Sequence, residues 1–318
     1  MNRRILITAI LALWLLTACS PSDQKANPTT QYQTSVVNGR IAFYSRAHEG
    51  ICIMNADGTS VTDRLTSIWS ADPAWSPDGQ QIAFTSGNNS EGYNIFVINA
   101  DGTNMRQLTQ HGGVWDHPVW SPDGTRVAFH AQSYDLGTIP SHRIGIVGVD
   151  GSDLTLVKPY WGEGKCYPLD TPAWSPDGKQ IAFGGYCRDR DAHGGEFGEE
   201  HMGIFTMSPD GSSVTQLIRF SGGLSNMDLD WSPDGKRIAF SAVIAEMGGQ
   251  QIYVMDADGT GLVQLTTNGG RYPSWSPDGK QIVYESGDVS SPALYVISTD
   301  GSGTRRSVGA GSDPDWSP

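Results

Sequence analysis

The sequence WSPDGQQIAF, residues 75–84, carries the strongest structural signal in the chain. Proline presets the backbone angle for a tight turn, aspartate accepts a local hydrogen bond, and glycine returns the chain in a left-handed conformation. The pentapeptide recurs four more times, each time followed by a similar apolar triplet. Its tryptophans are Trp75, Trp120, Trp174, Trp231 and Trp275. The pattern therefore predicts a hairpin of one kind, repeated along the chain.

Each hairpin opens a longer unit. After the apolar triplet come a variable stretch, an apolar run that closes on a second Asp-Gly turn, as at residues 95–102, and a short segment such as 107–109. Consecutive tryptophans are 41 to 57 residues apart when Trp316 is included. Four short antiparallel strands in a unit of this length are typical of a propeller blade. We therefore predict an all-β propeller over residues 36–318.

The two ends of this region complement each other. The chain stops at Trp316-Ser317-Pro318, where the other copies continue with Asp-Gly and a strand. The missing part stands at the other end, since residues 38–43, NGRIAF, resemble the turn and strand of the other copies. We expect the last strand to complete the first of six blades and close the ring, leaving no open edge.

The first residues have a different composition. Arg3 and Arg4 precede an apolar run over residues 5–16, which is too short to span a bilayer. With Leu16-Thr-Ala-Cys19 after it, the segment 1–19 resembles a bacterial lipoprotein signal. The resemblance implies lipidation of Cys19 and anchoring to the cell envelope, at the periplasmic side of the outer membrane in a Gram-negative cell. The alternative is an ordinary secretory signal with a coincidental cysteine. We expect residues 20–35 to form a flexible tether.

The repeated Trp-Ser-Pro-Asp-Gly turns resemble the TolB-type β-propeller repeat over residues 36–318. That family carries an additional N-terminal α/β domain, whereas here only the tether precedes the first strand. The resemblance implies binding of protein partners in the envelope. It leaves the activity open, because propellers host many functions.

Aspartates gather shortly before the repeated tryptophans, where the chain should line the central channel. They are Asp72, Asp116, Asp170, Asp228 and Asp313. The remaining repeat has Arg271 and Tyr272 instead. Carboxylates around one channel mouth would attract calcium or a basic peptide, although no cofactor is required. The alternative is that each aspartate caps local backbone amides.

The connections opposite the uniform Asp-Gly turns vary in length, so we expect recognition on that face. Their aromatic residues, among them Trp115 and Trp161, either cap blade cores or stack on a ligand. We count both with the channel residues as candidate binding residues.

The cysteines fall into separate roles. Cys166 and Cys187 lie nearly symmetrically about the hairpin centred on Asp177, which predicts a disulfide in an oxidising compartment. Cys52 occupies a strand position filled by aromatic residues in other repeats, so it should be buried.

The sequence contains neither a nucleophile motif nor a phosphate-binding glycine loop. Histidines at metal-binding spacing are also missing. The net charge of −13 argues against nucleic acid as a partner. We therefore predict an envelope lipoprotein that binds a protein or peptide and is not an enzyme. The alternative is a carbohydrate-binding or metal-dependent polysaccharide-cleaving propeller, in which the following histidines converge: His130, His142, His193 and His201.

Overall fold

The computed structural model describes residues 39–88, 90–110, 113–133, 141–159, 165–169, 171–188, 200–220, 227–244, 249–288 and 290–318. They belong to one compact unit, Val37–Pro318. Within these ranges every regular element is a strand, which confirms the predicted all-β class. No helix in the described ranges has the length and apolarity that a membrane crossing requires.

The strands follow one another in the order that the repeats predict. They are β1 (Arg40–Ser45), β2 (Gly50–Asn55), β3 (Ala71–Trp75), β4 (Gln81–Asn88), β5 (Gly92–Asn99), β6 (Arg106–Gln107), β7 (Val114–Trp120), β8 (Arg126–Ser133), β9 (Ser141–Gly148), β10 (Thr155–Val157), β11 (Lys165–Pro168), β12 (Ala173–Trp174), β13 (Ile181–Arg188), β14 (Glu200–Met207), β15 (Thr215–Phe220), β16 (Leu229–Trp231), β17 (Arg237–Ala242), β18 (Gln251–Asp256), β19 (Val263–Gln264), β20 (Arg271–Trp275), β21 (Gln281–Ser286), β22 (Ala293–Ser298), β23 (Arg305–Ala310) and β24 (Ser312–Trp316).

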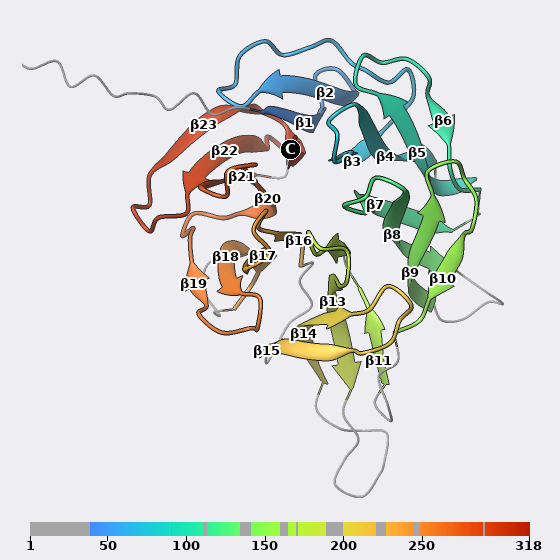
Figure 1. The fold of residues 1–318 in the computed structure, drawn as a ribbon. Helices are drawn as coiled ribbons and strands as arrows, with labels where there is room; N and C mark the ends of the chain where they lie inside the picture. Colours follow the sequence, from blue (N-terminus) through green and yellow to red (C-terminus); the bar gives the residue numbers. More distant parts are fainter. Residues whose placement is uncertain are drawn as a thin grey trace, which may run out of the picture. The chain divides into compact units, whose positions relative to one another are not determined.

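The strands form antiparallel sheets that stand around a common centre, with β3, β7, β16 and β20 innermost (Figure 1). Neighbours in each sheet are mostly consecutive in sequence, as in β16-β17-β18-β19 and β20-β21-β22-β23. Two such groups, β3 to β6 and β7 to β10, are joined by a single parallel bridge between Tyr93 and Val114. The order β2-β1-β24 departs from this rule, because it places the last strand of the chain beside the first.

The pairing of β1 with β24 is supported by side chains and backbone. Ile41 lies opposite Trp316, and the Ser317 amide donates to the Arg40 carbonyl at 2.7 Å. The Arg40 amide in turn donates to the Ser317 hydroxyl at 2.7 Å. Gly39 passes so close to Trp316 that a Cβ there would lie 2.6 Å from the indole nitrogen. The two ends of the repeat region therefore share one sheet.

The repeated turns form as their residue types require. The Gly79 amide donates to the Ser76 carbonyl, and Gly79 has a φ of 65°. Asp78 accepts hydrogen bonds from the Ser76 hydroxyl at 2.6 Å and the Gln80 amide at 3.0 Å. These hydrogen bonds lower the pKa of Asp78. The repeated turn aspartates thus accept hydrogen bonds within the turns and do not pair as catalytic carboxylates.

The repeated tryptophans are core residues, 4 to 6% exposed. One core cluster joins Ile51 and Ile53 of β2 to Trp75 and Phe84 of the next repeat. Because each sheet face covers its neighbour in this way, the stability of one repeat depends on the next.

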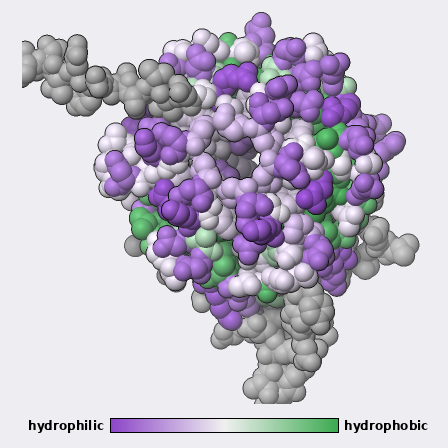
Figure 2. Space-filling model, in the orientation of Figure 1, coloured by the Kyte–Doolittle hydropathy of each residue, from purple (hydrophilic) through white to green (hydrophobic). Residues whose placement is uncertain are grey.

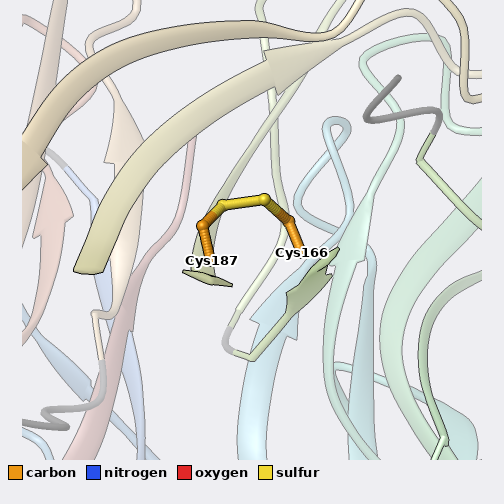
Figure 3. The surroundings of a disulfide bond; sticks show 2 residues. All are labelled: Cys166 and Cys187. Carbon is orange, nitrogen blue, oxygen red and sulfur yellow. A yellow bond between two sulfur atoms is a disulfide. The ribbon is translucent and has the colours of Figure 1, made fainter. Parts of the chain in front are cut away.

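The predicted disulfide is confirmed. Cys166 on β11 and Cys187 on β13 lie opposite each other in the ladder and are joined (Figure 3). Cys52 is free and fully buried, as predicted.

Candidate functional site at the centre of the propeller

A cavity of about 110 Å³ lies where the innermost strands meet. The space-filling view shows a hollow at the centre of the ring, bordered by many hydrophilic residues (Figure 2). The wall is built from the residues one to three positions before each repeated tryptophan, as in Asp72-Pro73-Ala74 before Trp75. The sequence repeat therefore supplies the wall from several sheets at once.

Four wall residues adopt an unusual backbone conformation. Asp72, His117, Tyr272 and Asp313 have φ values between 49° and 52°, and proline follows each of them. At the same places the pairing register shifts, as between Ala71 and Ala74. A bulge of this kind re-aims a side chain, and here these residues line the cavity. Strained non-glycine residues gathered at one place point to function.

The structure brings part of the predicted channel set together. Asp72, Asp228, Asp313 and Tyr272 all lie on the cavity wall. Arg271, in contrast, is not a wall residue, since its guanidinium pairs with the Glu285 carboxylate at 2.7 Å. Asp170, Trp161 and Cys19 lie outside the described residues.

Two predicted binding residues need correction. Asp116 does not line the cavity. Its carboxylate lies 3.2 Å from His117 Nδ1 and accepts a hydrogen bond from His130 Nδ1 at 2.9 Å. Trp115 is 1% exposed and packs on Phe129, so it belongs to the core. The pairing register shifts between Asp116 and Val119, so a bulge interrupts the regular alternation of side chains just after these two residues.

His117 is a wall residue that sequence reasoning missed. It occupies the position three before Trp120, in the same column as Asp72 and Tyr272. Aligning the repeats on their tryptophans would have exposed it. Its Nε2 lies 3.8 Å from the Asp72 carboxylate, and its ring stacks on Tyr272 with centroids 6.4 Å apart.

The cavity carries a mixed charge. Burial opposes the protonated form of His117, but the carboxylates of Asp72 and Asp116 outweigh this and hold its pKa well above the usual value. Burial raises the pKa of Asp228 and, together with the charges of Asp72 and Glu285, that of Asp313. Some wall carboxylates therefore hold a proton to a higher pH than usual and would lose it to a bound cation.

Polar residues one position before the tryptophans connect neighbouring repeats. The Trp275 amide donates to Asp230 at 2.7 Å and the Trp75 amide to Asp315 at 2.6 Å. The Ser274 hydroxyl accepts from the Trp316 amide at 3.0 Å. Burial raises the pKa of Asp230 to about 8 and that of Asp315 to about 6. These three polar residues, which stand before Trp231, Trp275 and Trp316, were also missed from the sequence.

A line of side chains leads outward from Asp116. His130 Nδ1 meets the Asp116 carboxylate, and His130 Nε2 lies 3.0 Å from His142 Nδ1. The His142 ring stacks on Tyr167, which is 39% exposed. Of the four histidines that the metal alternative required, His130 and His142 do converge. His201 is buried on β14, and His193 lies outside the described residues.

Over the described residues no group of three or more His, Cys, Asp or Glu side chains has the arrangement of a metal site. The calcium predicted for the channel stays a prediction. Calcium usually takes six to eight oxygen ligands.

Comparisons with known proteins agree with this fold. The family described as the TolB beta propeller domain matches residues 41–139 and 141–318. The Tol-Pal system protein TolB of Francisella tularensis subsp. mediasiatica is 31% identical over 101 residues, which are 32% of this chain and 20% of that protein. The aligned part thus spans about a fifth of that relative's length.

Solved structures show the same architecture. TolB from Acinetobacter baumannii superposes with a TM-score of 0.70 at 24% identity, over 89% of this chain and 67% of that one. Oligogalacturonate lyase from Vibrio parahaemolyticus gives a TM-score of 0.52 at 12% identity, over 86% of this chain and 74% of that one. At these identities the likeness shows the fold alone. Since the family model covers most of the chain, the protein belongs to the TolB β-propeller family.

Proposed function

We propose that this chain is a cell-envelope lipoprotein whose propeller binds a protein or peptide partner, with a cationic group of the partner entering the central cavity. The observation that carries the proposal is the meeting of Asp72, Asp228 and Asp313 on one cavity wall. A lysine or arginine side chain could pair with these carboxylates, and Tyr272 could cover its apolar stem.

Three lines of support stand beside this observation. The family contains Tol-Pal system proteins, which suggests a partner in the envelope. Wall residues held in strained conformations keep the carboxylates in place before a ligand arrives, which reduces the entropy cost of binding. The varied connections around the cavity could supply specificity. We further propose that the partner is bound without catalysis.

We also infer six blades, with the first completed by the C-terminal strand. Six Trp-Ser-Pro segments and the pairing of β1 with β24 support this count. For the N-terminus we propose lipidation at Cys19 and anchoring at the periplasmic side of the outer membrane in a Gram-negative cell.

The binding proposal can be tested with the full chain as bait in an envelope extract. Captured partners are identified by mass spectrometry, and a synthetic peptide from the partner's contact segment is titrated by calorimetry. Asp72→Asn and Asp313→Asn should each weaken binding by roughly tenfold, as expected for loss of a charge-assisted hydrogen bond of about 1.5 kcal/mol. The control Asp63→Asn removes an exposed charge outside the cavity and should bind as the wild type does.

Unchanged affinity in both cavity variants would refute the role of the cavity. The same titration with calcium chloride tests the metal, and oligogalacturonate tests the carbohydrate alternative. Sugar binding that Asp72→Asn abolishes, without any captured protein, would replace the peptide proposal.

Lipidation has its own test. Mass spectrometry of the mature protein from membranes should find the N-terminal peptide beginning at Cys19 with an acyl-sized mass increase. Cys19→Ser should abolish this increase. A wild-type N-terminus without lipid would contradict the anchor and leave the cavity proposal standing.

A further inference from the structure

Two histidine nitrogens face each other between paired strands, away from the cavity. His130 Nε2 on β8 lies 3.0 Å from His142 Nδ1 on β9. His130 is 7% exposed, whereas His142 is half-buried. The strands pair antiparallel over their whole length, so the sheet holds the spacing of the two rings.

Both rings are held by a second partner. The Asp116 carboxylate accepts a hydrogen bond from His130 Nδ1 at 2.9 Å, which leaves a lone pair on Nε2 directed at His142. A histidine that binds a metal is commonly fixed by a carboxylate on its other nitrogen in this way. The His142 ring lies nearly parallel to Tyr167, with an interplanar angle of 19° and centroids 5.5 Å apart.

We propose that His130 Nε2 and His142 Nδ1 bind one divalent transition-metal ion of the copper(II) class, with solvent molecules completing its coordination. Metal–imidazole bonds are about 2.0–2.1 Å long, so two nitrogens 3.0 Å apart subtend an angle of roughly 91–97° at the metal. Tetragonal ions such as copper(II) and nickel(II) take this angle, whereas tetrahedral zinc requires a wider one. Copper(II) also has the highest intrinsic affinity for such ligands.

The two rings can exchange a hydrogen bond for a bound metal ion without a change in the charge of His142. In the metal-free protein His142 Nδ1 donates its hydrogen to His130 Nε2. On metal binding, His142 Nδ1 gives up that hydrogen and Nε2 of the same ring takes up a proton, so His142 stays neutral. The ion lies beside the line between the two nitrogens, and both rings turn slightly to direct their lone pairs at it. Neither histidine lines the central cavity, and the inference does not depend on peptide binding.

The test is a titration of the full chain with copper(II) sulfate, followed by electron paramagnetic resonance. We expect one tightly bound copper per chain, an axial spectrum, and coupling to two imidazole nitrogens. His142→Gln should lose the two-nitrogen coupling and at least about tenfold in affinity. The matched control His48→Gln changes an exposed histidine and should leave both unchanged.

Asp116→Asn keeps both ligands but removes the carboxylate that orients His130. It should weaken copper binding by roughly 10- to 100-fold while preserving the coupling to two nitrogens. Asp72→Asn, which alters the cavity, should bind copper normally. Wild-type affinity in a folded His142→Gln protein would overturn the proposal. If that variant does not fold, the wild-type spectrum decides, and the lack of coupling to two imidazole nitrogens overturns the proposal.

Discussion

At the scale of single residues, Asp230 and Asp315 both stabilise the contact between repeats and make the stability of the fold depend on pH. Each accepts the backbone amide of the tryptophan in the neighbouring repeat. Burial raises both pKa values, to about 8 and about 6, above the value of about 3.9 in an unfolded chain. The folded protein therefore holds these protons more tightly than the unfolded chain does. Their contribution is fully present below pH 4, and the free energy of unfolding falls as pH rises through about 6 for Asp315 and about 8 for Asp230.

Replacing Asp230 by asparagine should remove part of this pH dependence. Asparagine keeps an oxygen for the Trp275 amide but has no proton to lose. Between pH 5 and pH 8 the melting temperature of Asp230→Asn should fall by at least about 2 °C less than that of the wild type. Calorimetric melts across this range provide the measurement, with Asp63→Asn as the exposed control. Parallel curves for Asp230→Asn and wild type would show that the carboxyl is ionised throughout.

At the scale of elements, β24 holds the first sheet together. Trp316 is 4% exposed. The Ser317 amide donates to the Arg40 carbonyl, and the Ser317 hydroxyl accepts from the Arg40 amide, 277 residues away in sequence. Terminal residues are usually dispensable because few contacts depend on them. Here the last strand covers one edge of β1 and places Asp315 beside the next repeat.

Removal of residues 313–318 should therefore cost far more stability than six terminal residues normally do. The truncated chain loses a buried tryptophan, which alone is worth about 3–5 kcal/mol, and exposes a strand edge. We expect a melting temperature lower by more than about 6 °C, or aggregation. Pro318→Ala, a change at the exposed last residue, is the control. A truncated chain that melts with the wild type would mean that β24 is not needed for closure.

The disulfide provides a second element-scale prediction. It links β11 to β13 at directly opposed positions, 21 residues apart in sequence. Alanine is the better replacement, since serine would place hydroxyls beside apolar residues. Cys166→Ala combined with Cys187→Ala should destabilise the fold by about 3 kcal/mol, as expected for a loop of this length. Urea denaturation measures the loss, and equal midpoints with and without the bond would contradict it.

At the scale of the whole molecule, strands from the two ends of the described chain share one sheet. Because β1 and β24 already pair, joining Pro318 to Gly39 through Asp-Gly would restore the length of the repeated turn, seven positions from tryptophan to the first isoleucine of the strand. The new ends can be opened at Gly301, in an exposed turn where nothing lies close to the glycine.

Such a circular permutant should fold and melt at or above the temperature of residues 39–318, because the closing strand becomes part of a local hairpin. Circular dichroism and a thermal scan provide the measurement. A permutant that stays unfolded would indicate that the position of the chain ends is essential.

The chain itself determined the hairpins, the all-β class and the disulfide, because turn residues and alternating strands act over a few positions. It also located Asp72, Asp228 and Asp313 near a common centre. An alignment of the repeats on their tryptophans places His117, and not Asp116, in the column of Asp72 and Tyr272. The search for aspartates alone selected Asp116, because residue type does not show to which side a strand turns each of two adjacent residues. That side depends on a bulge, and the bulge depends on proline and on pairing with the neighbouring strand.

Tertiary structure alone decided the rest. Asp230 and Asp315 became interblade acceptors with raised pKa values because packing between sheets removed water from them. His130 Nε2 lies 3.0 Å from His142 Nδ1 because the two residues stand on paired strands, although no sequence spacing marks them as a pair. Local chemistry thus determined which turns and strands form, whereas burial and the packing of sheets around one centre decided which side chains meet and how they are charged.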